Sequence, residues 1–175
     1  DTLIASLKAA AVGLGETKTI ADLATSAMNA YGVENLNATG ATDILVASVR
    51  EGKLEASELA GSMGGVIPIA SNMGVSFAEV GAAMAAMSRT GTNAAVGATQ
   101  LTAILASIKK PTMQSAEAML ALGTSQEEIA QSLEQKGLMP TLMDLSARLE
   151  QTGMDASAIF PNIRALKGDL DLTGK

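Results

Sequence analysis

Apolar residues recur every three or four positions along nearly the whole chain, and glycine, proline and capping residues separate the runs. This spacing is typical of amphipathic helices, and no stretch alternates with period two for long enough to predict a strand. The pattern therefore predicts an all-α fold, an array of short antiparallel helices joined by Gly/Pro turns. The runs with few charges and many small residues predict a central helical hairpin.

The first part of the chain predicts helices with recognisable ends. An apolar stripe over residues 20–31 ends at Gly32, in the place of a C-cap glycine, and Thr17 is the expected N-cap. Residues 33–40 are expected to form a loop. A short helix should follow and end near Gly52.

The middle of the chain predicts a long helix and then a capping box. Residues 54–73 are expected to form one helix with a kink at Pro68. In the capping box, the Ser76 hydroxyl accepts from the N–H of Glu79 while the Glu79 carboxylate reaches back. This box should start the next helix, which Gly91 ends.

The second half of the chain predicts further short helices. Thr92 or Asn93 is the expected cap of the helix that Pro111 stops. Ser125 and Glu128 match a second capping box. The last helix is expected to carry four residues in its apolar stripe, which are Ile159, Ile163, Leu166 and Leu170.

Two long stretches, residues 59–78 and 90–108, carry no charge. A spanning helix needs about 20 mostly apolar residues, and Gly74 and the capping box at Ser76 interrupt the first stretch. A soluble core fits both stretches better, because small residues let helix axes approach closely. The small residues expected at such contacts are Gly61, Gly64, Gly65, Gly81, Ala85, Gly97 and Ala98.

Composition removes most classes of chemistry. The 175 residues carry a net charge of −6 and include neither Cys nor His. The chain therefore cannot form a Cys/His zinc site, a Ser-His-Asp triad or a Cys nucleophile. Scattered basic residues do not make a face that neutralises several phosphates. Because there is no initiator Met and no basic leader, we expect a segment excised from a longer chain, without a signal peptide.

Two acidic or glycine-rich motifs favour structure over chemistry. The sequence GLGETKT at residues 13–19 lacks the Gly-Lys-Ser/Thr ending of a phosphate loop, so we expect a turn between helices, with Gly15 ending the first one. Glu127 and Glu128 are adjacent and point about 100° apart on a helix. Their charges suit the first turn of a helix better than a shared substrate.

Three other motifs are equally weak evidence for a functional site. Asp169 and Asp171 lack the glycine and the bidentate glutamate of a calcium loop. Asn37 begins a glycosylation sequon, which matters only in a secreted eukaryotic protein. Gly61 and Gly65 match a helix-dimer motif that in a glycine-rich soluble chain more often means local packing. We therefore predict no catalytic, cofactor-binding or metal-binding residue, no cofactor and no enzymatic activity.

Ten methionines supply much of the apolar character. Met84 and Met87 lie on a helix stripe and are expected in the core. Met63, Met73 and Met139 are harder to place, and they are candidates for a surface that faces a partner.

Residues 49–112 hold an ordered set of features. A helix with a small-residue and proline segment leads to G-V-S, a capping acid, an Ala-rich helix, a glycine turn and a Gly/Ala/Thr helix that ends in K-P-T. These features are Pro68, Gly74-Val75-Ser76, Glu79, Arg89-Thr90-Gly91 and Lys110-Pro111-Thr112. In their order and spacing the chain resembles the tail tape-measure proteins (minor tail proteins) of long-tailed bacteriophages and prophages, most strongly over 49–123.

The resemblance implies a structural function. Such proteins are extended helical assemblies in the tail tube, their length sets that of the tail, and they leave the tube so that DNA can pass. The expected role is tail assembly and tail-length determination, by helix packing and self-association rather than catalysis. The expected partners are tail-tube, tail-tip and tail-assembly chaperone proteins. The expected location is the virion tail lumen, and the host bacterial cytoplasm during assembly.

Residues 1–175 are expected to form a single all-helical segment, with a family-like core at about 41–123 and a C-terminal helical part at 124–175. The long coiled-coil stretches of the family are missing, so length measurement itself is not assigned to these residues. The alternative is a membrane-active helical hairpin of residues 59–78 and 90–108 that acts in pore formation or genome delivery. Specific nucleic-acid binding and stable membrane insertion are not expected.

Overall fold

The computed structural model describes residues 2–11, 16–54 and 56–174. Over these residues the chain forms eleven α-helices and one short 3₁₀ helix, and no strand. The all-α prediction is therefore confirmed. The helices are α1 (Thr2–Ala11), α2 (Thr17–Tyr31), α3 (Ala38–Glu51), α4 (Ala56–Met63), α5 (Ile67–Asn72), α6 (Phe77–Arg89), α7 (Ala94–Lys109), α8 (Met113–Ala121), α9 (Gln126–Lys136), α10 (Leu138–Thr152), the 3₁₀ helix η1 (Ala156–Ala158) and α11 (Ile163–Thr173).

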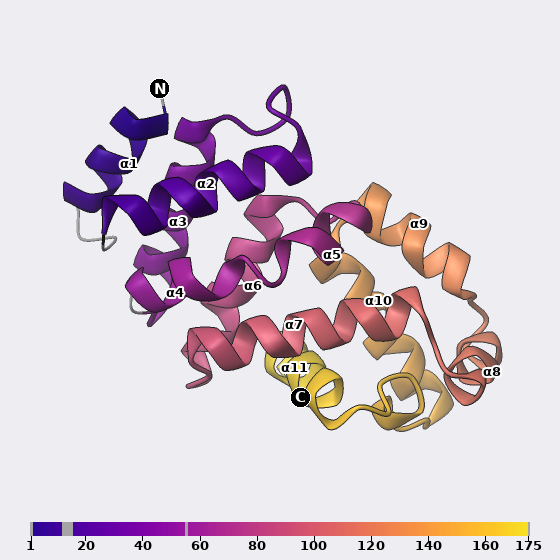
Figure 1. The fold of residues 1–175 in the computed structure, drawn as a ribbon. Coiled ribbons are helices and arrows are strands. Elements are labelled where there is room, and N and C mark those ends of the chain that lie inside the picture. The colour runs from indigo at the N-terminus through magenta and orange to yellow at the C-terminus, as the bar shows by residue number, and fades with distance from the viewer. Residues whose placement is uncertain (1, 12–15, 55, 175) are drawn as a thin grey trace.

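The helices gather around a central pair (Figure 1). Helices α1, α2 and α3 pack together at one end of the molecule, and α8, α9 and α10 lie at the other end. Helices α6 and α7 lie between these groups and pack against each other, while α4 and α11 both pack along α7. Helix α7 is therefore covered by neighbours from both halves of the chain.

One continuous core joins almost all of these helices. Its buried apolar side chains run from Ala9 in α1 to Leu172 in α11. The two uncharged stretches contribute much of it, since Leu59, Met63 and Leu105 are all fully buried. Burying one such side chain stabilises the fold by about 1.5–3 kcal/mol. These stretches are therefore core, as the interrupted pattern predicted.

The central hairpin of α6 and α7 has the ends that the sequence predicted. Ser76 and Glu79 form the capping box at the start of α6, and the Asn93 side chain caps α7 by accepting from the N–H of Val96 at 2.9 Å. Small residues lie where the two helices meet, since a Cβ added at Gly97 would be in van der Waals contact with the sulfur of Met84 at 3.5 Å. The prediction of a small-residue hairpin is confirmed for these two helices.

Helix α3 crosses α6 at small residues. A Cβ at Gly81 would clash with the Ser48 hydroxyl and lie 3.0 Å from a methyl group of Ile44. Nearby, the Ser88 hydroxyl accepts from the N–H of Lys53 at 2.8 Å. The crossing therefore depends on a glycine at position 81, as the packing argument predicted.

The expectation of one kinked helix over residues 54–73 is wrong. The structure has two helices, α4 and α5, with a turn at residues 64–66 between them. Pro68 lies in the first turn of α5. Backbone N–H groups in the first turn have no acceptor within the helix, so a proline there costs no hydrogen bond. The break falls at Gly64 and Gly65, because glycine destabilises a helix interior.

Three glycines expected at close helix contacts are instead open. A Cβ added at Gly61 or Gly64 would meet nothing within 4 Å, and one at Gly65 would meet only a backbone oxygen at 3.7 Å. The expected packing through the Gly61/Gly65 motif is therefore wrong. The motif faces a groove, described below.

Two predicted helix starts need correction. Helix α3 begins at Ala38, within the expected 33–40 loop, because the Asn37 side chain accepts from the N–H of Gly40 at 2.8 Å and caps it. The N-cap of α2 is Glu16, which makes no side-chain capping bond, while Thr17 is already helical. The expected helix end at Gly15 lies outside the described residues.

Two predictions near the C-terminus also need correction. Ile159 is buried, but it follows the 3₁₀ helix and precedes α11, since Pro161 separates the two. At α9, Ser125 accepts from the N–H of Glu128 at 3.2 Å, and the return bond of a full capping box does not form. The last helix packs on α7 so closely that a Cβ at Gly168 would lie 2.8 Å from the Cβ of Gln100.

The methionines occupy the core more fully than expected. Met84 and Met87 are buried as predicted. Met63 is also fully buried, while Met73 and Met139 are half-buried against the core. The expectation that these three face a partner is therefore wrong for Met63, whose neighbours belong to its own chain.

Candidate interaction surfaces

The acidic residues weighed as possible ligands have structural surroundings. Glu127 and Glu128 are exposed in the first turn of α9, where the helix dipole favours negative charge. Asp169 is buried on α11, and the Asp171 carboxylate accepts from the Thr92 hydroxyl at 2.9 Å. In the part of the chain that the structure describes, no three His, Cys, Asp or Glu residues form a cluster that could hold a metal ion.

The remaining motifs do not form a site either. Asn37 of the glycosylation sequon is the N-cap of α3. Residues 13–15 of the sequence that resembles a phosphate loop lie outside the described residues. Among the helices that the structure describes, none combines the length and hydropathy needed to cross a bilayer.

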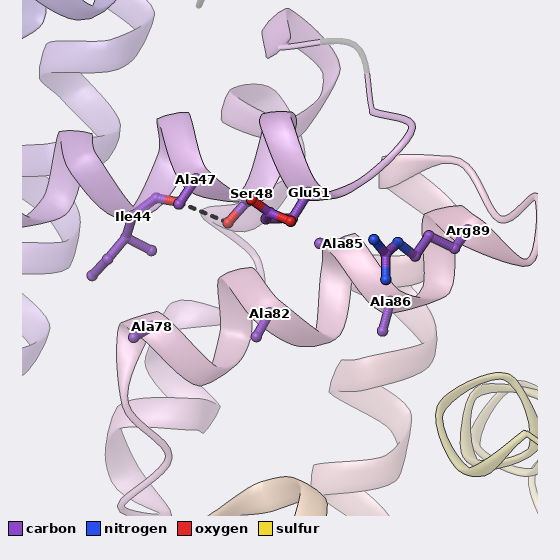
Figure 2. A pocket seen from close by; sticks show the side chains of 9 residues that line it. All are labelled: Ile44, Ala47, Ser48, Glu51, Ala78, Ala82, Ala85, Ala86 and Arg89. Carbon is purple, nitrogen blue, oxygen red and sulfur yellow. Dashed lines mark hydrogen bonds between the residues drawn. The ribbon is translucent and has the colours of Figure 1, made fainter.

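The first notable hollow is the α3–α6 pocket, which has a volume of about 280 Å³ (Figure 2). Figure 2 shows α6 supplying a row of small side chains along it, with Arg89 at one end. Two polar groups of the pocket are already engaged, since the Ser48 hydroxyl donates to the carbonyl of Ile44 at 2.8 Å and Glu51 pairs with Arg50. The pocket is lined by Ile44, Ala47, Ser48, Glu51, Ala78, Ala82, Ala85, Ala86 and Arg89.

This lining suits contact rather than catalysis. The α3–α6 pocket holds no acid–base pair aimed at a common point, and alanine side chains make most of its wall. A small apolar side chain of another helix fits such a wall, because apolar surface is then removed from water.

The second hollow is a longer groove over helix α7, here called the α7 groove. Two adjoining hollows of about 520 and 510 Å³ share Ala95, Thr99 and Arg164. The floor is the exposed side of α7, one wall is the end of α4, and the other is the start of α11. The lining residues are Gly61, Ser62, Gly65, Ala95, Val96, Ala98, Thr99, Gln100, Thr102, Ala103, Ala106, Asn162, Arg164 and Lys167.

The charge of the α7 groove lies on one wall. Arg164 and Lys167 are exposed and lie one helical turn apart on α11. Ion pairs among the described residues join Lys18 to Asp22, Arg50 to Glu51 and Arg148 to Asp144, and none of these three includes either cation. Gln100 in the floor is only 2% exposed, and its side-chain oxygen has no hydrogen-bond donor among the described residues.

Large apolar side chains are exposed on the outer face of α8. Met113 is 79% exposed and Leu120 is 67% exposed. They lie seven residues apart, so they share one face of the helix, with the exposed Glu117 between them. We call these three residues the α8 ridge.

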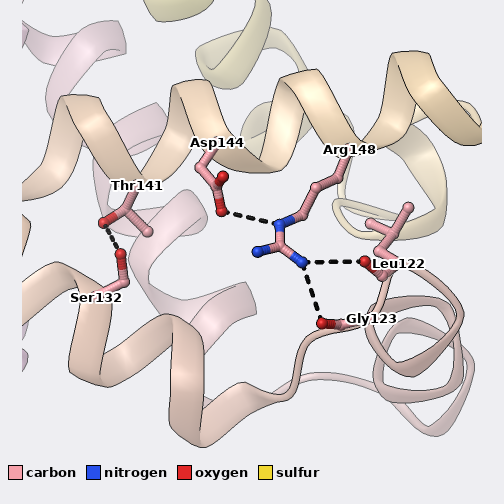
Figure 3. A network of polar contacts seen from close by, with 6 residues as sticks. All are labelled: Leu122, Gly123, Ser132, Thr141, Asp144 and Arg148. Atoms are coloured by element: carbon pink, nitrogen blue, oxygen red, sulfur yellow. Dashed lines mark hydrogen bonds and ion pairs between the residues drawn. The ribbon is translucent and has the colours of Figure 1, made fainter.

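A polar network holds α8 in place (Figure 3). The Arg148 guanidinium on α10 donates to the carbonyls of Leu122 and Gly123 at 3.2 and 3.1 Å and pairs with Asp144 at 2.9 Å. Capping of these carbonyls by a cation suits the negative end of the helix dipole. The α8 ridge is therefore presented by a fixed helix.

A half-buried tyrosine ties the N-terminal helices to the centre. The Tyr31 hydroxyl donates to the carbonyl of Val75 at 2.9 Å, and its ring lies 6.1 Å from that of Phe77. Burial raises the pKa of Tyr31 above its ordinary value, and the negative charge of Glu79 raises it further. These contacts are structural, since no acid–base partner lies beside the hydroxyl among the described contacts.

Sequence reasoning alone did not find the α3–α6 pocket, the α7 groove or the α8 ridge. Their residues come from helices that are distant in the chain, so only the fold brings them together. The one available signal was the pair Met113 and Leu120 at helical spacing, which sequence alone does not distinguish from a core stripe.

Comparison with known proteins identifies the family. The family model described as phage-related minor tail protein matches residues 2–160. The chain is 30% identical over 125 residues to the protein named tape measure protein in Pneumococcus phage Dp-1, which covers 71% of this chain and 11% of that protein. No solved structure matches significantly. The resemblance predicted from the central motifs is thus confirmed, and the chain belongs to the phage-related minor tail protein family.

Proposed function

We propose that this chain is a helix-packing segment of a phage tail tape-measure protein, which acts in tail assembly through contacts rather than catalysis. The observation that carries the proposal is the family match over residues 2–160. An all-helical core with two hollows lined mostly by small side chains and a ridge with exposed apolar side chains supports a role in contacts with other helices.

Tail-length determination belongs, in this proposal, to the whole protein. The matched region is 11% of the pneumococcal relative, so this chain spans a small part of such a protein. The described helices are short, the longest being α7 with 16 residues. Helices this short suit a compact anchoring segment better than a segment that sets the length of the tail, because a helix adds only about 1.5 Å per residue.

The proposed partners are tail-tube, tail-tip and tail-assembly chaperone proteins, and the proposed location is the tail lumen, with the host cytoplasm during assembly. A net charge of −6 disfavours binding to DNA. This charge suits a component of a tube through which DNA later passes.

The membrane-active hairpin receives no support from the helix boundaries. Residues 59–78 divide among α4, α5 and the start of α6, and they place Leu59, Met63 and Ile67 in the core. Inserting this stretch in a bilayer would require the core to open, so we do not carry the alternative forward.

Co-expression with the tail-tube, tail-tip and chaperone proteins of the same genome tests the proposal. We expect at least one of them to co-purify with the chain in a fixed ratio. Ala82→Glu places a charge in the α3–α6 pocket, and Ala147→Glu places one on the exposed side of α10 as a matched control. If none of the tail proteins binds the parent chain, the proposed docking role is wrong.

A further inference from the structure

We infer that the α8 ridge of one copy docks in the α7 groove of a second copy, so that copies associate head to tail. The inference rests on the proposed role in helix contacts, and it names a second copy of the chain as the partner and the two surfaces that carry the contact. It follows from the shape, charge and exposure of two surfaces that are separate on one molecule.

The ridge has the composition of a docking helix. Met113 and Leu120 leave most of their apolar surface in water, and the fold of this chain does not need such large side chains at exposed positions. Exposed apolar side chains on one helix face mark interaction sites when they lie together. Arg148 fixes the end of α8, so little order has to be gained on binding.

The groove has the composition of a receptor for such a helix. Its floor consists of alanine and threonine with one valine and the nearly buried Gln100, and Gly61 and Gly65 leave the α4 wall low. Small side chains on three helices leave room for large ones from a partner. An amphipathic helix that lays its apolar face in a groove is a recurring mode of recognition.

Length and charge match between the two surfaces. Helix α8 has nine residues and spans about 13.5 Å, so it fits within the groove, which follows α7 from Ala95 to Ala106 over about 18 Å. Glu117 lies in the middle of the ridge and has no ion-pair partner among the described residues. It would face Arg164 and Lys167, which are the two cations of the groove.

A docked α8 must come from another molecule. No residue of α8 lines the groove, and Figure 1 shows α8 at the far end of the molecule from α4. Because ridge and groove are different surfaces, the contact is heterologous: each copy keeps a free groove or a free ridge, and association continues. Phosphate is a poorer occupant, since two cations on a chain of net charge −6 attract a polyanion weakly.

Two variants test the contact. Gly61→Trp fills the groove, and it fits the fold because a Cβ at Gly61 meets nothing within 4 Å. Met113→Ser together with Leu120→Ser removes the ridge, at positions that are mostly exposed. Ala147→Trp is the matched control, since it adds the same large side chain at an exposed position of α10 outside the groove and the ridge. Circular dichroism verifies that each variant is folded.

Sedimentation velocity over a range of concentrations gives the readout. We expect the parent chain and Ala147→Trp to form species that grow with concentration, and each of the two test variants to associate at least about tenfold more weakly. A mixture of the two variants should form a one-to-one complex that grows no further, because one intact ridge meets one intact groove.

Three results would each overturn the inference: a parent chain that stays monomeric at millimolar concentration, a test variant that associates like the parent, or a mixture that remains monomeric. A parent chain that is monomeric but still binds a tail protein overturns this inference alone. The proposed docking role then stands, so the two failures are distinguishable.

Discussion

At the scale of single residues, Glu79 joins the ends of two helices. One oxygen of its carboxylate accepts from the N–H and the hydroxyl of Ser76 at 2.9 and 2.8 Å. The other accepts from the N–H of Leu138 at 2.7 Å, at the start of α10. Charge-assisted bonds to helix N-termini are among the stronger hydrogen bonds in proteins. A single side chain thus fixes α10 against the central hairpin.

Gly137 is the residue that lets Glu79 approach. Its φ is +91°, and an added Cβ would clash with the Glu79 carboxylate. We expect Gly137→Ala to lower the free energy of unfolding by about 1–3 kcal/mol from the positive-φ extended backbone, and by about 1–3 kcal/mol more from the displaced carboxylate. Gly153→Ala is the control, because its φ is +68° and its Cβ would meet nothing within 4 Å. Equal losses for both variants in urea unfolding would refute the role of Glu79.

Tyr31 predicts a loss of stability at alkaline pH. Burial and then Glu79 raise its pKa in the folded chain, so above about pH 10 the unfolded chain binds fewer protons than the folded one. The contribution of Tyr31 to the free energy of unfolding is therefore complete below that pH and declines above it. At neutral pH we expect Tyr31→Phe to lose about 1 kcal/mol with the bond to Val75. In urea unfolding the gap between parent and variant should shrink above about pH 10, and a constant gap would contradict this explanation.

At the scale of elements, sequence reasoning located most helices because caps are local. The Ser76 box and the Asn93 cap use residues three apart, and both appear as predicted. The sequence predicts a kink at Pro68, whereas the structure has a break at Gly64 and Gly65. A proline in the first turn of a helix and a proline in a helix interior look alike in the sequence, because only the position of the helix start distinguishes them.

The surfaces needed information that no local pattern contains. The walls of the α7 groove come from α4 and α11, about one hundred residues apart. Whether a small-residue face is buried or open also depends on the neighbouring helix, as Gly81 and Gly61 show. The sequence also does not show which face of α8 is exposed, since Met119 on the same helix is buried while Met113 is exposed.

These two glycines predict opposite effects of one substitution. Gly61→Ala should raise the free energy of unfolding by about 0.5–1 kcal/mol, because alanine favours a helix and the site is open. Gly81→Ala should instead lower it by about 1–3 kcal/mol, because the new methyl group presses on Ser48 and Ile44. Thermal or urea unfolding of the two variants gives the comparison. The same sign for both would show that helix propensity, rather than the α3–α6 crossing, decides stability.

At the scale of the whole molecule, the C-terminal helices complete the core of the earlier ones. Helix α11 packs along α7, and the N–H of Leu138 in α10 donates a hydrogen bond to the Glu79 carboxylate of α6. The core residues on both sides of position 124 form one cluster. A chain cut after residue 123 would therefore expose apolar side chains of α7 to water.

Cooperative unfolding tests this dependence. We expect the chain to unfold in one transition by circular dichroism and fluorescence of a bound apolar dye, because a single core favours all-or-none behaviour. A chain of residues 1–123 should lose that transition and bind the dye when native. If residues 1–123 unfold with the same midpoint as the complete chain, then residues 124–175 form an independent unit, contrary to this account.

Tail formation by the parent phage tests the central proposal, that this segment works as a structural part of the tail. The complete protein carries Leu101→Asp, which places a charge in the fully buried face of α7, and Gly61→Ala serves as the control. Immunoblotting shows that each complete protein persists, and electron microscopy counts the tails. We predict filled heads without normal tails for Leu101→Asp and normal tails for Gly61→Ala. Normal, infectious tails in the Leu101→Asp phage would contradict the account.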